Sequence, residues 1–133
     1  MSELRIVVPA VPPSGNHYKK YRVIRSRTGE SFVQWYHTDL AEKWWALVDR
    51  AAGGRQLISE SYEVHFIVYR ETLRNTDVDN YSKCIFDALT KAHVISDDRY
   101  VDDFHGHRRL DRANPRTVIL VRAAQVQMFE SEA

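Results

Sequence analysis

The sequence predicts a small mixed α/β (α+β) fold, in which a mixed sheet of four to five strands packs against two main helices. Three observations lead to this prediction. Short strand-like runs occur near both ends of the chain and at its centre, and two longer segments repeat apolar residues at intervals of three and four. The length of 133 residues is enough for one ordinary hydrophobic core and too short for two. We therefore expect residues 1–133 to form a single domain.

The N-terminal part of the chain carries strand signals. Residues 4–8 are a short apolar run, and the prolines that follow cannot continue a strand ladder. Residues 18–22 alternate aromatic and basic side chains, which can stack on bases and pair with phosphates. The same pattern is equally typical of an edge strand with a polar face. A turn at Thr28 and Gly29 then leads into a further strand-like run over residues 32–36.

The first predicted helix covers residues 39–52. Asp39 and Glu42 have the spacing of a capping box, and Gly53 with Gly54 ends the helical pattern. Trp44 and the neighbouring Trp45 are expected in the core or in an interface. One buried stripe is predicted from the apolar positions Leu40, Trp44, Leu47, Val48 and Ala51.

The second half of the chain predicts the remaining elements. Residues 62–68 alternate apolar and polar side chains, as in a central strand with one buried face. A helix follows over residues 78–92, with Cys84 expected at the margin of its packing face. Two more strands, over residues 100–107 and 117–121, are joined by a polar turn. The inward side chains of the helix are predicted to be Ile85, Phe86, Ala88 and Leu89.

Composition excludes several classes of protein. With 44% hydrophobic and 28% charged residues, the chain resembles an ordinary globular protein and neither a disordered nor a collagen-like one. Cys84 is the only cysteine, so an intrachain disulfide and a thiolate zinc cluster within one chain are excluded. No segment approaches the roughly 20 apolar residues that span a bilayer. We expect a cytoplasmic protein with no membrane partner.

The net charge of +1 hides an uneven distribution. Residues 1–28 hold six basic residues and one acid, whereas acids gather between Asp77 and Asp103. An acidic centre with basic flanks suits a polyanionic substrate that has to reach a carboxylate site, because lysine and arginine attract phosphate at long range. A solvated surface of mixed charge would give similar runs, so charge alone leaves nucleic acid as one of several partners.

The candidate catalytic residues lie between Arg74 and Val101. Asp77 and Asp79 are separated by one residue, so both carboxylates project to the same side of an extended segment. Two carboxylates about 5 Å apart repel by about 3 kcal/mol at an effective dielectric constant of 20, which a cation or a shared proton would relieve. The alternative is that Asp79 only caps the helix and Asp77 is a solvated loop acid.

Asp79, Lys83 and Asp87 follow at intervals of four and share one helix face. An exposed ladder of ion pairs would use the same spacing. If the loop with Asp97 and Asp98 returns beneath the helix, carboxylates and one lysine converge. Such a set can hold Mg²⁺ and hydrolyse a phosphodiester, because carboxylate oxygens are the ligands this ion prefers and an ammonium group stabilises developing charge.

These segments resemble one known family, the RusA-type Holliday junction resolvases. The resemblance covers most of the chain, with residues 30–70 and the last thirty poorly diagnostic. The proline-rich start of the family, followed by asparagine, is similar to residues 12–18. The other matching segments are Asp77-Val78-Asp79-Asn80, Lys83, Phe86-Asp87-Ala88-Leu89 and Asp97-Asp98-Arg99-Tyr100-Val101.

The resemblance implies a homodimeric endonuclease that binds four-way DNA junctions and, with Mg²⁺ and no small-molecule cofactor, makes two symmetric nicks. In that comparison Asp77, Asp79 and Asp98 correspond to the essential carboxylates that hold the metal. Lys83 matches the lysine that the family needs for cleavage. The positions expected to support them are Asn80, Asp87 and Asp97.

Two residues depart from the pattern. His93 stands where the family usually has glycine after the helix, although histidine tolerates a left-handed backbone. Thr76 replaces a basic residue that often precedes the first acid, so DNA binding would shift toward the basic N-terminal segment. The residues expected to bind DNA are Asn16, Lys19, Lys20, Arg22, Arg25 and Arg74.

Some alternatives stay open at this level. A junction has two strands to cut, which favours a two-fold pair of subunits, and Trp44, Trp45 and residues 32–36 could form the contact between them. His105 and His107 alternate on a predicted strand, as auxiliary metal ligands or as solvent-facing residues. The function could also be cleavage of other branched DNA or of RNA, or junction binding without cleavage.

Overall fold

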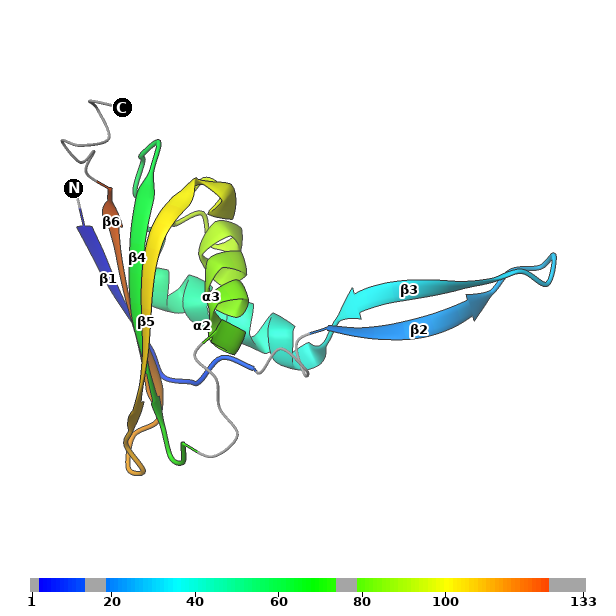
Figure 1. Ribbon diagram of the computed structural model, residues 1–133, viewed down its shortest axis with the longest axis horizontal. Coiled ribbons are helices and arrows are strands. Elements are labelled where there is room, and N and C mark those ends of the chain that lie inside the picture. The colour runs from blue at the N-terminus through cyan, green and yellow to red at the C-terminus, as the bar shows by residue number, and fades with distance from the viewer. Residues whose placement is uncertain (1–2, 14–18, 74–78, 125–133) are drawn as a thin grey trace.

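A computed structural model of the chain describes residues 3–13, 19–73 and 79–124, and only the backbone of Lys19, Lys20, Asp79 and Asn80. Six strands, two α-helices and one short 3₁₀ helix lie in these ranges, which confirms the predicted α+β class (Figure 1). The elements are β1 (Glu3–Val8), β2 (Lys19–Arg25), β3 (Ser31–His37), α2 (Asp39–Ala52), β4 (Tyr62–Arg70), α3 (Asp79–Lys91), η1 (Asp98–Tyr100), β5 (Val101–Leu110) and β6 (Arg116–Ala123).

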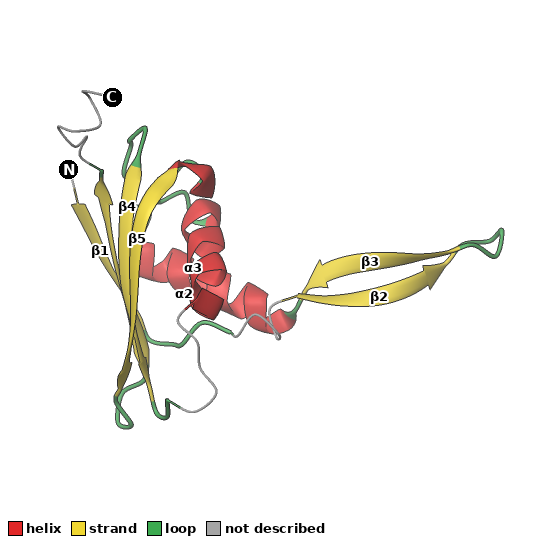
Figure 2. Cartoon of the chain, viewed as in Figure 1, coloured by secondary structure: helices red, strands yellow, loops and turns green. Residues whose placement is uncertain are grey.

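Four of the strands form a mixed sheet in the order β1-β6-β4-β5. β6 pairs antiparallel with both β1 and β4, whereas β5 runs parallel to β4 at the edge. The connection from β4 to β5 contains α3, as a parallel pair requires a crossover. The two helices cover one face of this sheet (Figure 2).

Alternation along the strands builds the core. In β4 the side chains of Tyr62, Val64, Phe66 and Val68 are buried, while the residues between them are half-buried. Since successive side chains point to opposite faces, the buried set faces the helices. The predicted central strand with one buried face is thereby confirmed. The same face of the sheet is completed by Leu4, Ile6, Val8, Ile119 and Val121.

The N-cap of helix α2 lies one residue before the predicted one. The N-cap is Thr38, whose side-chain oxygen accepts a hydrogen bond from the backbone N–H of Ala41 at 3.4 Å, so the prediction of Asp39 as the capping residue was wrong. Asp39 instead lies in the first turn, where its charge favours the helix dipole. The predicted stop is confirmed, because Gly53 ends the helix with φ of 61°.

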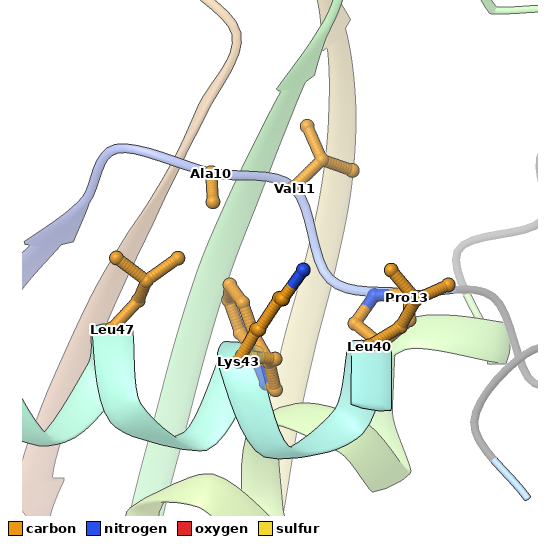
Figure 3. Close-up of a pocket in the computed structure, with 7 residues that line it drawn as sticks. Ala10, Val11, Pro13, Leu40, Lys43 and Leu47 are labelled. Atoms are coloured by element: carbon orange, nitrogen blue, oxygen red, sulfur yellow. The ribbon is translucent and has the colours of Figure 1, made fainter. Parts of the chain in front are cut away.

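The buried stripe of α2 is rotated by about one residue from the prediction. Its buried side chains are Ala41, Trp44, Val48 and Ala52, and Leu40 is 53% exposed. Leu40 and Leu47 instead line a groove of about 220 Å³ beside the chain that follows β1. Figure 3 shows Ala10, Val11 and Pro13 opposite this side of the helix. The segment after β1 therefore runs along this side of α2.

Helices α2 and α3 are joined by a buried hydrogen bond. The indole Nε1 of Trp44 donates to the backbone oxygen of Cys84 at 2.9 Å. Cys84 itself is 1% exposed and its Sγ lies 3.2 Å from the oxygen of Pro13, so it is a core residue and its predicted place at the margin was wrong. Ile85, Ala88 and Leu89 are buried as predicted, and Phe86 is half-buried.

Strands β2 and β3 form a separate two-stranded sheet, which we call the arm (residues 19–37). The arm projects away from the sheet and helices (Figure 1). Every residue of β3 is exposed, including Trp35 at 64%. Within the described ranges, no helix is both long and apolar enough to cross a membrane.

Candidate active site

A polar cleft of about 340 Å³ lies where α3, η1 and the end of β3 meet. Asp98 reaches it from η1, and Lys83 with Asp87 reaches it from α3. The acid of the late Asp97-Asp98 pair is therefore on the same side of the molecule as the helix that begins at Asp79. His37, Thr90 and Lys91 complete the lining.

Helical spacing explains why α3 presents these groups together. Lys83, Asp87 and Lys91 are four residues apart and lie on one face, opposite the buried Ile85 and Leu89. The helix is held by that apolar face, so the polar face points into the cleft. Asp79 is the first residue of the same helix, one turn before Lys83.

The short helix η1 fixes the two late aspartates differently. Asp97 caps it, since its Oδ1 accepts a hydrogen bond from the backbone N–H of Arg99 at 3.0 Å. This bond is the main cause that lowers the pKa of Asp97. Asp97 thus keeps its charge outside the cleft while Asp98 lines the cleft itself.

The pKa of Asp98 is raised instead. Partial removal of water is the largest cause, followed by a hydrogen bond with Asp97 and by the negative charges of Asp97 and Asp87, whereas Lys83 acts in the opposite direction. The negative charges of Asp87 and Asp97 around Asp98 therefore outweigh the positive charge of Lys83. A hard divalent cation fits such a group of carboxylate oxygens, because it would remove this repulsion.

The start of α3 is anchored from the neighbouring sheet. The side chain of Arg70, at the end of β4, donates a hydrogen bond to the hydroxyl of the buried Tyr81 and also lies over its ring. Tyr81 is 2% exposed and lies on α3 between Asp79 and Lys83. The first turn of α3 is thus fixed against the last residue of β4.

The turn after α3 has the geometry that glycine usually provides. His93 has φ of 59°, and it is the sole non-glycine residue with positive φ in the described ranges. The backbone N–H of His93 bonds to the oxygen of Thr90, and that of Val94 to the oxygen of Leu89, as in a Schellman motif. The expectation that histidine preserves this turn is confirmed.

Several predicted site residues lie outside what the structure describes. Asn16, Arg74 and Asp77 fall in ranges that are not described, as do His17 and Thr76. Side chains are likewise not described for Lys19, Lys20, Asp79 and Asn80. Their roles stay predictions.

Two predicted DNA-binding residues are described on the arm. Arg22 donates through Nε to the Oε1 of Gln34 at 2.8 Å and lies over the ring of Tyr36 at 5.5 Å. Arg25 is exposed at the end of β2. Beside them, Tyr21 and Trp35 are in ring contact at 5.3 Å. Cations and exposed aromatic rings therefore share the arm.

Sequence reasoning missed three residues of the cleft. His37 ends β3 and lines the cleft, and its ring meets that of Trp45 at 4.8 Å. Lys91 also lines the cleft, with its Nζ 4.2 Å from the Trp45 ring centre. A signal for Lys91 exists in the sequence, because it continues the four-residue spacing of Asp79, Lys83 and Asp87. Nothing in the sequence indicates that Thr90 or His37 would be near.

Carboxylates and lysines that share a cleft on a small α+β fold suit metal-dependent hydrolysis of a phosphodiester, the chemistry of a nuclease. The family Endodeoxyribonuclease RusA matches residues 11–122, so the chain belongs to the RusA family and is an endodeoxyribonuclease. The nucleases of this family are metal-dependent, in agreement with the charges of the cleft. One similar protein is the crossover junction endodeoxyribonuclease RusA of Aquifex aeolicus (strain VF5), which is 25% identical over 127 residues, or 94% of this chain and 95% of that protein.

Proposed function

We propose that this chain is a Mg²⁺-dependent endonuclease that resolves Holliday junctions by paired symmetric nicks in DNA recombination and repair. It would act in the cytoplasm as a homodimer, with residues 1–133 as one domain. The observation that carries the proposal is that Asp98 shares a cleft with Lys83 and Asp87, on the helix that starts at Asp79. The similar protein of Aquifex aeolicus bears the name of a crossover junction endonuclease.

Each residue of the cleft has a distinct role in the proposal. Asp98, together with Asp77 and Asp79, would hold the metal through carboxylate oxygens. Bound Mg²⁺ supplies a Lewis acid and a water of lowered pKa for attack on the phosphodiester. Lys83 places an ammonium group where a phosphate oxygen gains charge during cleavage. Asp87 lies one turn further along α3 and orients Lys83 by opposite charge.

The arm supplies binding in this proposal. The arm carries one acidic residue, Glu30, and five basic residues, which are Lys19, Lys20, Arg22, Arg25 and Arg27. A two-stranded ribbon fits the major groove of DNA, and basic side chains bind its phosphates. Asn16 and Arg74 would extend this surface. The exposed aromatics of β3 can also contact a second subunit, a role for which the buried Trp44 is now excluded.

Cleavage of a labelled four-way junction at increasing Mg²⁺ tests the proposal. The native chain should give paired symmetric nicks, and Asp98→Asn should lose activity by at least about 100-fold. Its junction affinity should stay equal or rise, because the change removes a negative charge near the phosphate. Lys83→Met should lower kcat more than it weakens binding.

The matched control is Asp49→Asn, an exposed aspartate on α2 outside the cleft, which should cleave like the native chain. Full activity in Asp98→Asn would contradict the assignment of the cleft. Efficient cutting of unrelated branched DNA or RNA would instead identify a nuclease of other specificity. Tight binding without product at any Mg²⁺ concentration would identify a junction-binding protein.

A further inference from the structure

Two short segments of like chemistry lie side by side on the sheet face that is turned away from the helices. β4 carries Glu63 and His65, and β5 carries Asp103 and His105. The strands are parallel and in register here, with Glu63 opposite Asp103 and His65 opposite His105. The acid-x-histidine pattern is thus repeated on neighbouring strands, and we call these four residues the histidine square.

Alternation places the histidine square on this outer face. Val64 and Phe66 are buried beneath the helices, and Phe104 meets the ring of Phe86 on α3 at 5.2 Å. The residues between them must therefore point the other way. The side chain of His65 is 30% exposed and that of His105 is 51% exposed, so an ion in solution can reach both.

The donor atoms of the histidine square are close together. The Nε2 of His65 is 2.9 Å from the Oε1 of Glu63, and the two imidazole rings stack with their centres 4.7 Å apart. One ligand atom from each of Glu63, His65 and His105 lies within 4.8 Å of the others. Asp103 Oδ1 is 3.3 Å from the Nε2 of His105. Bonds in a tetrahedral site are about 2 Å, so the stacked imidazoles and Asp103 have to rotate toward one common point when the ion binds.

A cation already lies against this group. Arg122 donates through Nε to Glu63 Oε2 at 2.8 Å and through Nη2 to Oε1 at 3.2 Å, and Nη2 is 3.4 Å from His65 Nε2. A guanidinium has no lone pair, so it can only donate, and Nε2 accepts from it only in the tautomer that carries the ring proton on Nδ1. In the other tautomer the Nε2–H donates to Oε1, and that proton lies between the two atoms. A metal ion can take that place when the guanidinium swings toward solvent.

We propose that Glu63, His65 and His105, with Asp103 as the fourth ligand, bind one first-row transition-metal ion such as Zn²⁺, at a site separate from the acidic cleft. Two imidazoles with two carboxylates select such ions over Mg²⁺ and Ca²⁺, which prefer all-oxygen sites. Binding would join the edge strand β5 to the central strand β4. Because β5 follows η1 directly, the ion would also stabilise the strand that begins beside Asp98.

Titration of the full chain with Zn²⁺ in excess Mg²⁺ tests the site, with calorimetry for stoichiometry and the visible absorption of Co²⁺ as a second probe. We expect one Zn²⁺ per chain, a tetrahedral Co²⁺ spectrum and a rise of several degrees in Tm. His105→Ala should weaken binding at least 10-fold and abolish the Co²⁺ spectrum. Its exposure on an edge strand makes it the variant that keeps its fold if His65→Ala does not.

Two matched variants decide the location. His107→Ala removes a histidine from the same face two residues further along β5 and should bind Zn²⁺ like the native chain, as should Asp98→Asn. Arg122→Gln should bind several-fold more tightly, because the competing guanidinium is gone. Loss of binding in Asp98→Asn, unchanged binding in His105→Ala, or no gain in Arg122→Gln would overturn the proposal. None of these results depends on nuclease activity.

Discussion

Cys84 is the clearest case in which burial determines the chemistry of one residue. Loss of water, and secondarily the negative charge of Asp87, raises the pKa of its thiol to about 12. The thiolate is the reactive form, so the native thiol should be inert. We predict that a thiol reagent modifies less than one tenth of the native protein in an hour at pH 8. The same reagent should modify it fully in concentrated urea, and rapid modification of the folded chain would contradict the burial.

The same shift predicts how stability changes in alkali. In the unfolded chain the thiol has a pKa of 9.0, so above pH 9 the unfolded state loses a proton that the folded state keeps. The free energy of unfolding should therefore fall as pH rises from about 9 to 12, by up to about 1.4 kcal/mol per pH unit from this group. Cys84→Ala should show a shallower decline in urea titrations over this range, and an identical decline would count against the shift.

His93 stores strain that a single substitution can release. A left-handed backbone costs a residue with a side chain about 1–2 kcal/mol, and glycine recovers part of this after its larger entropy in the unfolded chain is subtracted. We predict that His93→Gly stabilises the protein by about 0.5–1 kcal/mol in urea unfolding. His93→Val should destabilise it by about 1 kcal/mol or more, because a β-branched side chain tolerates this backbone poorly. The reverse order would show that the turn is not under strain.

At the scale of elements, the contact between α2 and α3 depends on one indole. Trp44 is 2% exposed and donates to the oxygen of Cys84, so Trp44→Phe loses both a buried hydrogen bond and part of the packing. We predict a loss of about 2 kcal/mol in the free energy of unfolding. Trp35→Phe is the matched control on the exposed arm and should change it by less than about 0.5 kcal/mol. Equal effects would mean that the indole does not hold the helices together.

Local patterns predicted the element types, because the spacing of apolar residues along a strand or a helix matches the side that the fold buries. The strands around Leu4, Tyr62 and Thr117 and both helices follow from such patterns. The exposed Leu40 could not be predicted, since it depends on where the chain after β1 crosses α2. The cap could not be assigned because Thr38 and Asp39 are adjacent and both are residue types that cap helices. Nor does a local pattern show that β2 and β3 form an isolated arm, because pairing partners are long-range information.

The candidate site divides in the same way. The four-residue spacing predicted that Lys83 and Asp87 share a face, and Asp98 lines the same cleft as these two residues. The predicted approach of Asp98 to Asp77 and Asp79 stays a prediction, because those side chains lie outside the described residues. His37 could not be predicted in the cleft because it comes from the base of the arm. The histidine square could not be predicted from the sequence, because Glu63 and Asp103 become neighbours only through the register of β4 with β5.

For the whole molecule, charge separation should determine how DNA binding responds to salt. Removal of one side chain that neutralises a phosphate makes the dependence of log K on log salt concentration less steep by about 0.9. We predict that replacing Lys19, Lys20 and Arg22 together by alanine reduces this slope by about 2–3 in junction binding at several salt concentrations. Arg50→Ala, on α2 away from the arm, should leave the slope within about 1 of the native value. A slope unchanged in the triple variant would place the DNA elsewhere.

The length of the arm determines how much nucleic acid the protein can contact beyond its sheet and helices. Each of its strands has seven residues, and at about 3.4 Å per residue the ribbon spans about 24 Å. Duplex DNA advances about 3.4 Å per base pair, so this reach corresponds to roughly seven base pairs. A footprint on a junction arm should accordingly extend past the edge of the globular part, and shortening the hairpin residue by residue should retract the protected boundary in proportion.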